Sequence, residues 1–181
     1  MKKLLLLFVL GLMLGSTAHA ENGAQWLLSI DRYKGVAPVT NEVYEEECGS
    51  CHFAYPPGLL PLRSWQKLID KQALKDHFGD NAELDDEVIA ELRAYVDGNA
   101  ADQVWYKTSR KFNQSLKSGE TPSRITKTEF FQWRHEEVPK KYFDQAKVKS
   151  PSFCDKCHQE AKFGVFEEDT VMIPEYGYWT W

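Results

Sequence analysis

The chain has 181 residues and a formal net charge of −5, and this length allows one ordinary domain or two small ones. The charge is unevenly divided, because residues 21–100 carry 7 Lys and Arg against 15 Asp and Glu, whereas residues 101–181 carry 13 against 12. Neither half has the strong basic excess of a nucleic-acid-binding domain, so we expect no nucleic-acid partner.

The first 20 residues predict a signal peptide. Lys2 and Lys3 form a basic start, residues 4–14 an apolar run, and residues 18–20, Ala-His-Ala, a cleavage site. An uncleaved anchor is the alternative, but the apolar run is shorter than the ~20 residues of a membrane span. No later segment is long and apolar enough to cross a membrane. We therefore expect a mature chain, residues 21–181, that is soluble, exported to the periplasm and not stably inserted in a membrane.

In the rest of the chain, apolar residues recur at helical spacing and period-2 stretches are scarce, which predicts a mostly α-helical protein. Residues 174–181 are expected to form an irregular aromatic tail. Capping residues, prolines and glycines divide the helical pattern into segments. Helices are expected at residues 40–47, with Thr40 as cap; 64–79, with Ser64 as cap and Gly79 as stop; 85–98; 104–112; 126–139, with Thr126 and Glu129 as a capping box; and 150–164.

Two five-residue motifs carry the chemistry. Residues 48–52 read Cys-Gly-Ser-Cys-His and residues 154–158 read Cys-Asp-Lys-Cys-His, and the pattern C-x-x-C-H is typical of c-type haem attachment. Two intervening residues let both thiols reach the two vinyl groups of one haem, and His52 or His158 then lies under the iron as its proximal ligand. We expect two covalent haem c groups, bound through Cys48, Cys51, Cys154 and Cys157.

Other uses of these four cysteines fit less well. The two pairs lie about 100 residues apart, far outside the spacing of a zinc ribbon. A redox-active dithiol is usually accompanied by a βαβ pattern, which the sequence lacks. Two disulfides are open to an exported chain. None of these uses accounts for a histidine after the second cysteine in both motifs.

The distal ligands follow from the histidine count. Of five histidines, His19 is removed with the signal peptide and two are proximal, which leaves His77 and His135, one for each iron. Met172, the only methionine of the mature chain, and an open distal site are the alternatives. We expect bis-histidine ligation of both irons, with His52 paired to His77 and His158 to His135, and the sequence also permits a crossed pairing.

The chain resembles the dihaem cytochrome c family of exported bacterial electron carriers, in residues 48–52, 77–82, 133–139 and 154–158. The resemblance implies two low-spin haems with His77 and His135 as distal ligands. It also implies that a carbonyl of the proline-rich loop at residues 55–61, with Pro57 as a candidate, orients His52. We expect two small haem-binding domains: residues 21–100, similar to class I cytochrome c, and residues 101–181.

Irons with both axial positions filled leave no site for a substrate, so we expect a carrier of single electrons and not an enzyme. The resemblance implies an oxygen-binding monohaem cytochrome as electron acceptor and a membrane b-type cytochrome as donor. The alternatives are a small dihaem oxidoreductase or peroxidase and a haem-based redox sensor, each of which needs one open haem site.

Overall fold

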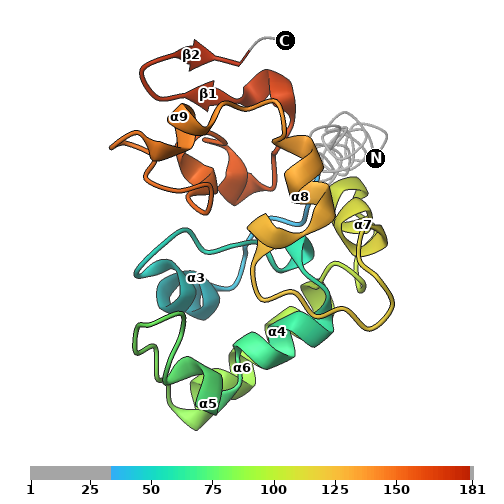
Figure 1. Cartoon of the computed structure of the whole chain (residues 1–181). Helices are drawn as coiled ribbons and strands as arrows, with labels where there is room; N and C mark the ends of the chain where they lie inside the picture. The colour runs from blue at the N-terminus through green and yellow to red at the C-terminus, as the bar shows by residue number, and fades with distance from the viewer. Residues whose placement is uncertain (1–33, 180–181) are drawn as a thin grey trace, which may run out of the picture. The chain divides into compact units, whose positions relative to one another are not determined.

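The computed structural model describes residues 34–179, and the predicted signal peptide lies outside them. Within this range the protein is mostly α-helical, as predicted, with one antiparallel hairpin (Figure 1). In that view α3 to α6 lie in the lower part, α9 and the hairpin in the upper part, and α8 between them. The helices are α3 (Glu42–Gly49), α4 (Leu62–Leu68), α5 (Lys71–Leu74), α6 (Asp86–Asn99), α7 (Lys107–Gln114), α8 (Glu129–Arg134) and α9 (Lys140–Asp144); the strands are β1 (Met172–Ile173) and β2 (Gly177–Tyr178).

The α6 helix matches the segment predicted at residues 85–98. Asp85 is its N-cap residue, and Ile89, Leu92 and Val96 form its buried face. These three residues recur at the spacing of one face of a helix, which is why this helix could be recognised from the sequence.

The α3 helix is capped by Asn41 and not, as predicted, by Thr40. The side-chain oxygen of Asn41 accepts a hydrogen bond of 2.6 Å from the backbone N–H of Tyr44, which satisfies a donor that the first turn leaves free. The backbone N–H of Thr40 instead donates to the hydroxyl of Tyr95 at 3.1 Å, which joins the start of α3 to α6. The helix then ends at the first cysteine motif, as expected.

The single helix predicted at residues 64–79 is wrong. The chain forms α4, which starts after Pro61 with Ser64 inside it, and then α5, which Asp70 caps by accepting a hydrogen bond of 2.9 Å from the backbone N–H of Gln72. An aspartate that binds the following backbone competes with helix continuation, so the helix breaks at this point. His77 consequently lies beyond α5, in a tight turn.

Three predictions for the second half are also corrected. The cap of α8 is Thr128, whose hydroxyl accepts from the backbone N–H of Phe131 at 3.3 Å, and not Thr126. The second cysteine motif lies in a short 3₁₀ turn, Cys154–Lys156, rather than in a helix through Gly164. The tail is not wholly irregular, because it contains β2, which pairs with β1 directly before the tail.

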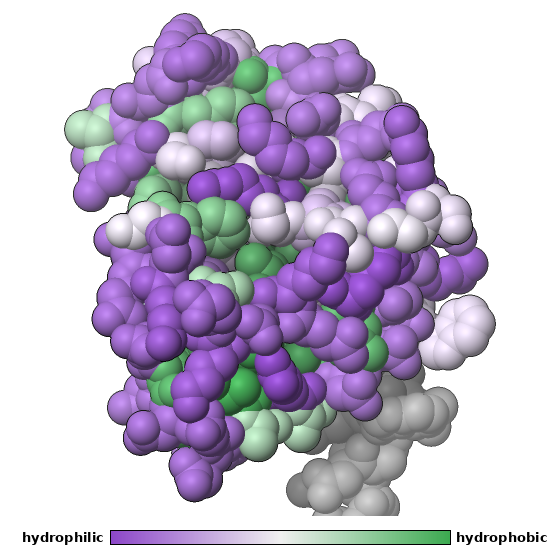
Figure 2. All heavy atoms as spheres, turned by 60° about the horizontal axis from the view of Figure 1, so that its bottom comes forward, coloured by the Kyte–Doolittle hydropathy of each residue, from purple (hydrophilic) through white to green (hydrophobic). Residues whose placement is uncertain are grey.

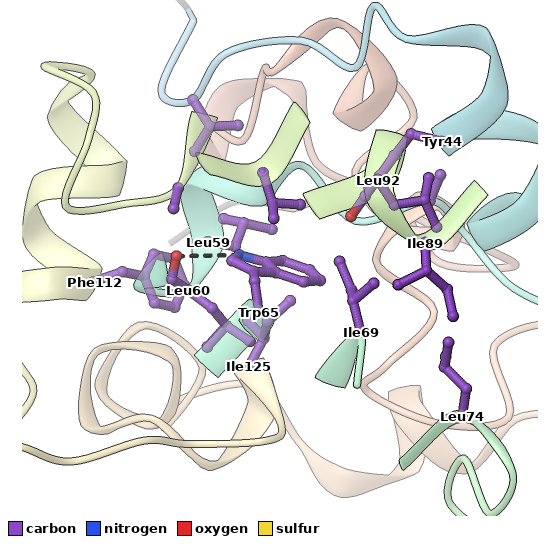
Figure 3. Packing of buried hydrophobic residues seen from close by; sticks show 14 of the residues in the cluster. Tyr44, Leu59, Leu60, Trp65, Ile69, Leu74, Ile89, Leu92, Phe112 and Ile125 are labelled. Carbon is purple, nitrogen blue, oxygen red and sulfur yellow. Dashed lines mark hydrogen bonds between the residues drawn. The ribbon is translucent and has the colours of Figure 1, made fainter. Parts of the chain in front are cut away.

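The core is a cluster of apolar side chains around Trp65 (Figure 3). The indole N–H of Trp65 donates to the carbonyl oxygens of Pro57, at 2.7 Å, and Leu60, at 3.2 Å. Phe112 and Ile125 belong to the same cluster, so packing crosses residue 100, and the predicted domain boundary there stays a prediction. The face that includes the lower helices is mostly hydrophilic, with hydrophobic residues in recesses (Figure 2).

The first described residues are bound to a segment near the end of the chain. The backbone N–H groups of Gly35 and Val36 donate to the carbonyl oxygen of Gly164 at 2.8 and 3.2 Å. Gly164 has a φ of +82°, and a Cβ atom there would lie 2.1 Å from the carbonyl oxygen of Val36. Only glycine fits this position, because the residue has a left-handed backbone and the backbone of another segment passes close to it.

Candidate functional site

The first cysteine motif begins in the last turn of α3. Cys48 belongs to the helix, and Cys51 and His52 follow it. The Nδ1–H of His52 donates to the carbonyl oxygen of Phe53 at 2.8 Å, so Nε2 keeps the lone pair that a metal requires. The carbonyl paired with His52 is therefore that of Phe53, not Pro57, whose oxygen accepts from the indole of Trp65.

His52 and His77 face each other. Their ring centroids lie 6.5 Å apart and their planes differ by 24°. Two metal–imidazole bonds of about 2 Å each, plus the half-width of each ring, add up to about 6 Å. The separation of the two ring centroids therefore matches that of two imidazoles bound to one metal ion.

The second pair is His135 with His158. Their ring centroids lie 6.1 Å apart and their planes differ by 76°. The Nδ1–H of His135 donates to the carbonyl oxygen of Phe131 at 2.8 Å, which again leaves Nε2 free. His158 has a buried ring nitrogen, Nδ1, that lacks a partner among the described residues. The structure therefore brings the histidines together locally, one pair in each half, and not in the crossed arrangement.

The surroundings of His77, His135 and His158 favour the neutral form of the imidazole. Burial lowers the pKa of His77, His135 and His158, for His158 to about 4, and the neighbouring His135 and Arg134 lower the His158 pKa further. Burial disfavours the charged form because it removes the water that would solvate it. A neutral imidazole is the form that binds a metal.

The four cysteines are free thiols, which does not support the two disulfides that the sequence left open. Burial raises the pKa of Cys48 and of Cys154 to about 12, and the carboxylates of Glu47 and Asp155 next to them act in the same direction. Both groups are thus protonated thiols near neutral pH. This is the form that supplies both the sulfur and the hydrogen when a thiol adds across a vinyl group.

A cavity of about 470 Å³ lies between the first pair of histidines and the core, within the ~300–1,000 Å³ of cofactor sites. Cys48, Cys51, His52 and His77 all line it, as does Cys154 of the second motif. The residues fit a haem, since thiols, two axial imidazoles and an apolar wall meet in one space. The apolar wall is formed by Leu60, Trp65, Leu68, Ile69, Leu74 and Leu92.

The dihaem cytochrome c family matches residues 44–166. The chain belongs to this family. A dihaem cytochrome c carries two haem groups, and proteins of the family are in general electron carriers. No curated protein matches the chain. Among residues 34–179, no helix is both long and apolar enough to span a membrane.

Solved structures of dihaem cytochromes c support the assignment. The new dihaem cytochrome c of Shewanella baltica OS155 is 40% identical, with a TM-score of 0.62, and the match covers 77% of this chain and 98% of that one. A dihaem cytochrome c of Rhodobacter sphaeroides is 35% identical, with a TM-score of 0.64, and the match covers 72% of this chain and 99% of that one.

Tyr55 is a site residue of this dihaem cytochrome c that sequence reasoning missed. Its ring centroid lies 4.9 Å from that of His52, and its hydroxyl donates to the carbonyl oxygen of Ser152 at 2.7 Å. Tyr55 thus joins the first haem motif to the chain that enters the second. No sequence signal could have shown this contact, because the acceptor is a backbone atom 97 residues away.

Proposed function

We propose that this protein is an exported carrier of single electrons with two covalently bound, bis-histidine haems. The observation that carries the proposal is the separation of the paired ring centroids. It is 6.5 Å for His52 and His77 and 6.1 Å for His135 and His158. In this proposal Cys48 and Cys51 bind one haem, with His52 and His77 as axial ligands. Cys154 and Cys157 bind the other, with His158 and His135 as axial ligands.

One imidazole of each pair is held in place by a hydrogen bond to the backbone. When bound, a haem supplies a one-electron Fe(III)/Fe(II) couple. The hydrogen bonds from His52 to Phe53 and from His135 to Phe131 fix the orientation of one imidazole in each pair. Two axial histidines also exclude small molecules from the iron, which favours electron transfer over the peroxidase and sensor alternatives.

Carbon monoxide tests ligation and separates the carrier from those alternatives. The reduced wild-type protein should show low-spin spectra for both haems and bind carbon monoxide poorly. His77→Ala and His135→Ala should each create one high-spin haem that binds it, and Met172→Ala should behave as wild type. Rapid binding of carbon monoxide to half of the wild-type haem, or loss of the low-spin spectrum in Met172→Ala alone, would overturn bis-histidine ligation.

The proposed location and partners rest on the signal-peptide pattern and on the resemblance. Periplasmic protein should begin at Glu21, which N-terminal sequencing would test. We propose a membrane b-type cytochrome as electron donor and an oxygen-binding monohaem cytochrome as acceptor. Reduction of the protein by one, and its oxidation by the other, in stopped-flow mixing would support this order, and the reverse direction would contradict it.

Charges near the second motif give a sharper test of partner binding. Lys147 and Lys156 form ion pairs with Glu175 and Asp155, whereas Lys141 and Lys162 form none among residues 34–179. Unpaired cations attract an acidic partner and raise its association rate in a salt-dependent manner. Lys141→Glu with Lys162→Glu should therefore slow electron exchange with an acidic partner at low salt more than Lys147→Glu with Lys156→Glu. Equal slowing, or no effect of salt, would count against a basic docking face.

A further inference from the structure

A single cation lines the cavity at the first pair of histidines. Among the described residues that line it, Arg124 is the only lysine or arginine, whereas Glu47, Asp80 and Glu83 contribute three carboxylates. Arg124 comes from the second half of the chain, and it is exposed although it lines the cavity.

The turn that carries His77 also holds Arg124. The backbones of His77 and Asp80 exchange hydrogen bonds of 2.8 and 3.3 Å, and Phe78 between them has a φ of +60°. A bulky residue with a left-handed backbone is uncommon and persists only when its surroundings require it. Here the ring of Phe78, although 47% exposed, lies under Arg124, with the guanidinium carbon 4.0 Å from the ring centroid.

The guanidinium of Arg124 has no carboxylate partner within residues 34–179. The other cavity-lining charges are acidic and would repel any anion placed there. A haem carries two propionate carboxylates, so a haem in this cavity needs a cation near its polar edge. Arginine suits this role, because its planar fork donates two parallel hydrogen bonds to one carboxylate.

We propose that Arg124 binds a propionate carboxylate of the haem held between His52 and His77. The inference rests on the proposed function, since it requires a haem in the first site. The second half of the chain then helps to bind the haem that is attached to the first half. It does so through residues 123–126, which line the cavity. Phe78 serves as a positioning residue, because it fixes the plane of the guanidinium.

The test uses the full holoprotein with Arg124→Gln and Arg124→Lys. Arg110→Gln is the matched control, because Arg110 also stacks on an aromatic ring, that of Trp105 at 5.6 Å, but does not line the cavity. The readouts are the propionate bending band in the resonance Raman spectrum and the two reduction potentials. Unchanged low-spin spectra in every variant show that haem binding itself is intact.

Arg124→Gln should shift the propionate band and lower one of the two potentials, because it removes the charge that balances the carboxylate. Arg124→Lys keeps the charge but loses the fork, so it should shift the band while leaving the potential close to that of the wild type. Phe78→Leu should shift the band in the same direction by a smaller amount, and Arg110→Gln should change nothing. A propionate band that is unchanged in both Arg124 variants would overturn the proposal, whatever the potentials do.

Discussion

The hydroxyl of Tyr55 and the carbonyl oxygen of Ser152 lie 2.7 Å apart and form a hydrogen bond between the two cysteine motifs. Tyr55 follows His52 by three positions, and Ser152 precedes Cys154 by two. The hydrogen bond therefore ties the residues that follow the first motif directly to those that precede the second.

Tyr55→Phe should lower the free energy of unfolding by about 1 kcal/mol, because it leaves a partly buried carbonyl with one hydrogen bond fewer. Denaturant titration of the holoprotein would measure this. Tyr178→Phe is the control, because Tyr178 is 70% exposed and its hydroxyl has no hydrogen bond within residues 34–179. If both variants were as stable as the wild type, the hydrogen bond would contribute nothing to stability.

Stability at alkaline pH should also depend on Tyr55. Burial is the main cause that raises the pKa of Tyr55 to about 12 in the folded protein, from 10.0 for an ordinary tyrosine. A raised pKa means that the contribution of this group is complete below pH 10 and is lost as the pH rises toward 12. The decline in unfolding free energy across that interval should be shallower in Tyr55→Phe, and identical slopes would contradict the assignment.

The two haems should differ in their paramagnetic resonance spectra. The planes of His52 and His77 differ by 24°, and those of His135 and His158 by 76°. Two near-parallel imidazoles interact with the same iron d orbital and so split the energies of the two dπ orbitals. Two near-perpendicular imidazoles interact with one dπ orbital each, so the two orbitals stay close in energy. The oxidised protein should therefore give one rhombic and one highly anisotropic low-spin signal, and only the latter should disappear in His135→Ala. Two identical signals would contradict the geometry.

Gly164→Ala should be strongly destabilising. The added Cβ would lie 2.1 Å from the carbonyl oxygen of Val36, at a residue with φ of +82°, so strain and overlap together should cost about 3 kcal/mol or more. Gly119 is a matched control, with a φ of +74° and no atom within 4 Å of its Cβ position. Gly119→Ala should cost only the backbone strain, about 1 kcal/mol. Thermal melts of both variants would decide, and equal losses would contradict the steric argument.

The sequence predicted best what depends on local spacing. The stripe of Ile89, Leu92 and Val96 identifies α6, and the two C-x-x-C-H motifs identify four cysteines and two histidines without any tertiary information. Where local signals compete, the prediction was wrong. Asp70 falls inside the single helix predicted at residues 64–79, yet its side chain caps a new helix, and His77 lies in a turn beyond that helix.

Contacts between segments that are distant in the sequence could not be predicted from it. Histidine counting selected His77 and His135 as candidates, but their distances from His52 and His158 depend on packing that no local pattern encodes. The same holds for Arg124, which lies over the ring of Phe78. This contact depends on the left-handed backbone of Phe78, a conformation that is uncommon for phenylalanine and that the sequence does not predict.

The hydrogen bonds from Gly35 and Val36 to Gly164 also impose an order in time. A polypeptide is synthesised from its N-terminus, so residues 35 and 36 emerge early and have no acceptor until almost the whole chain has followed. Such distant pairings form late in folding, because a long loop must close first. The segment that leads into α3 and Cys48 is therefore among the last parts of the chain to be fixed in place.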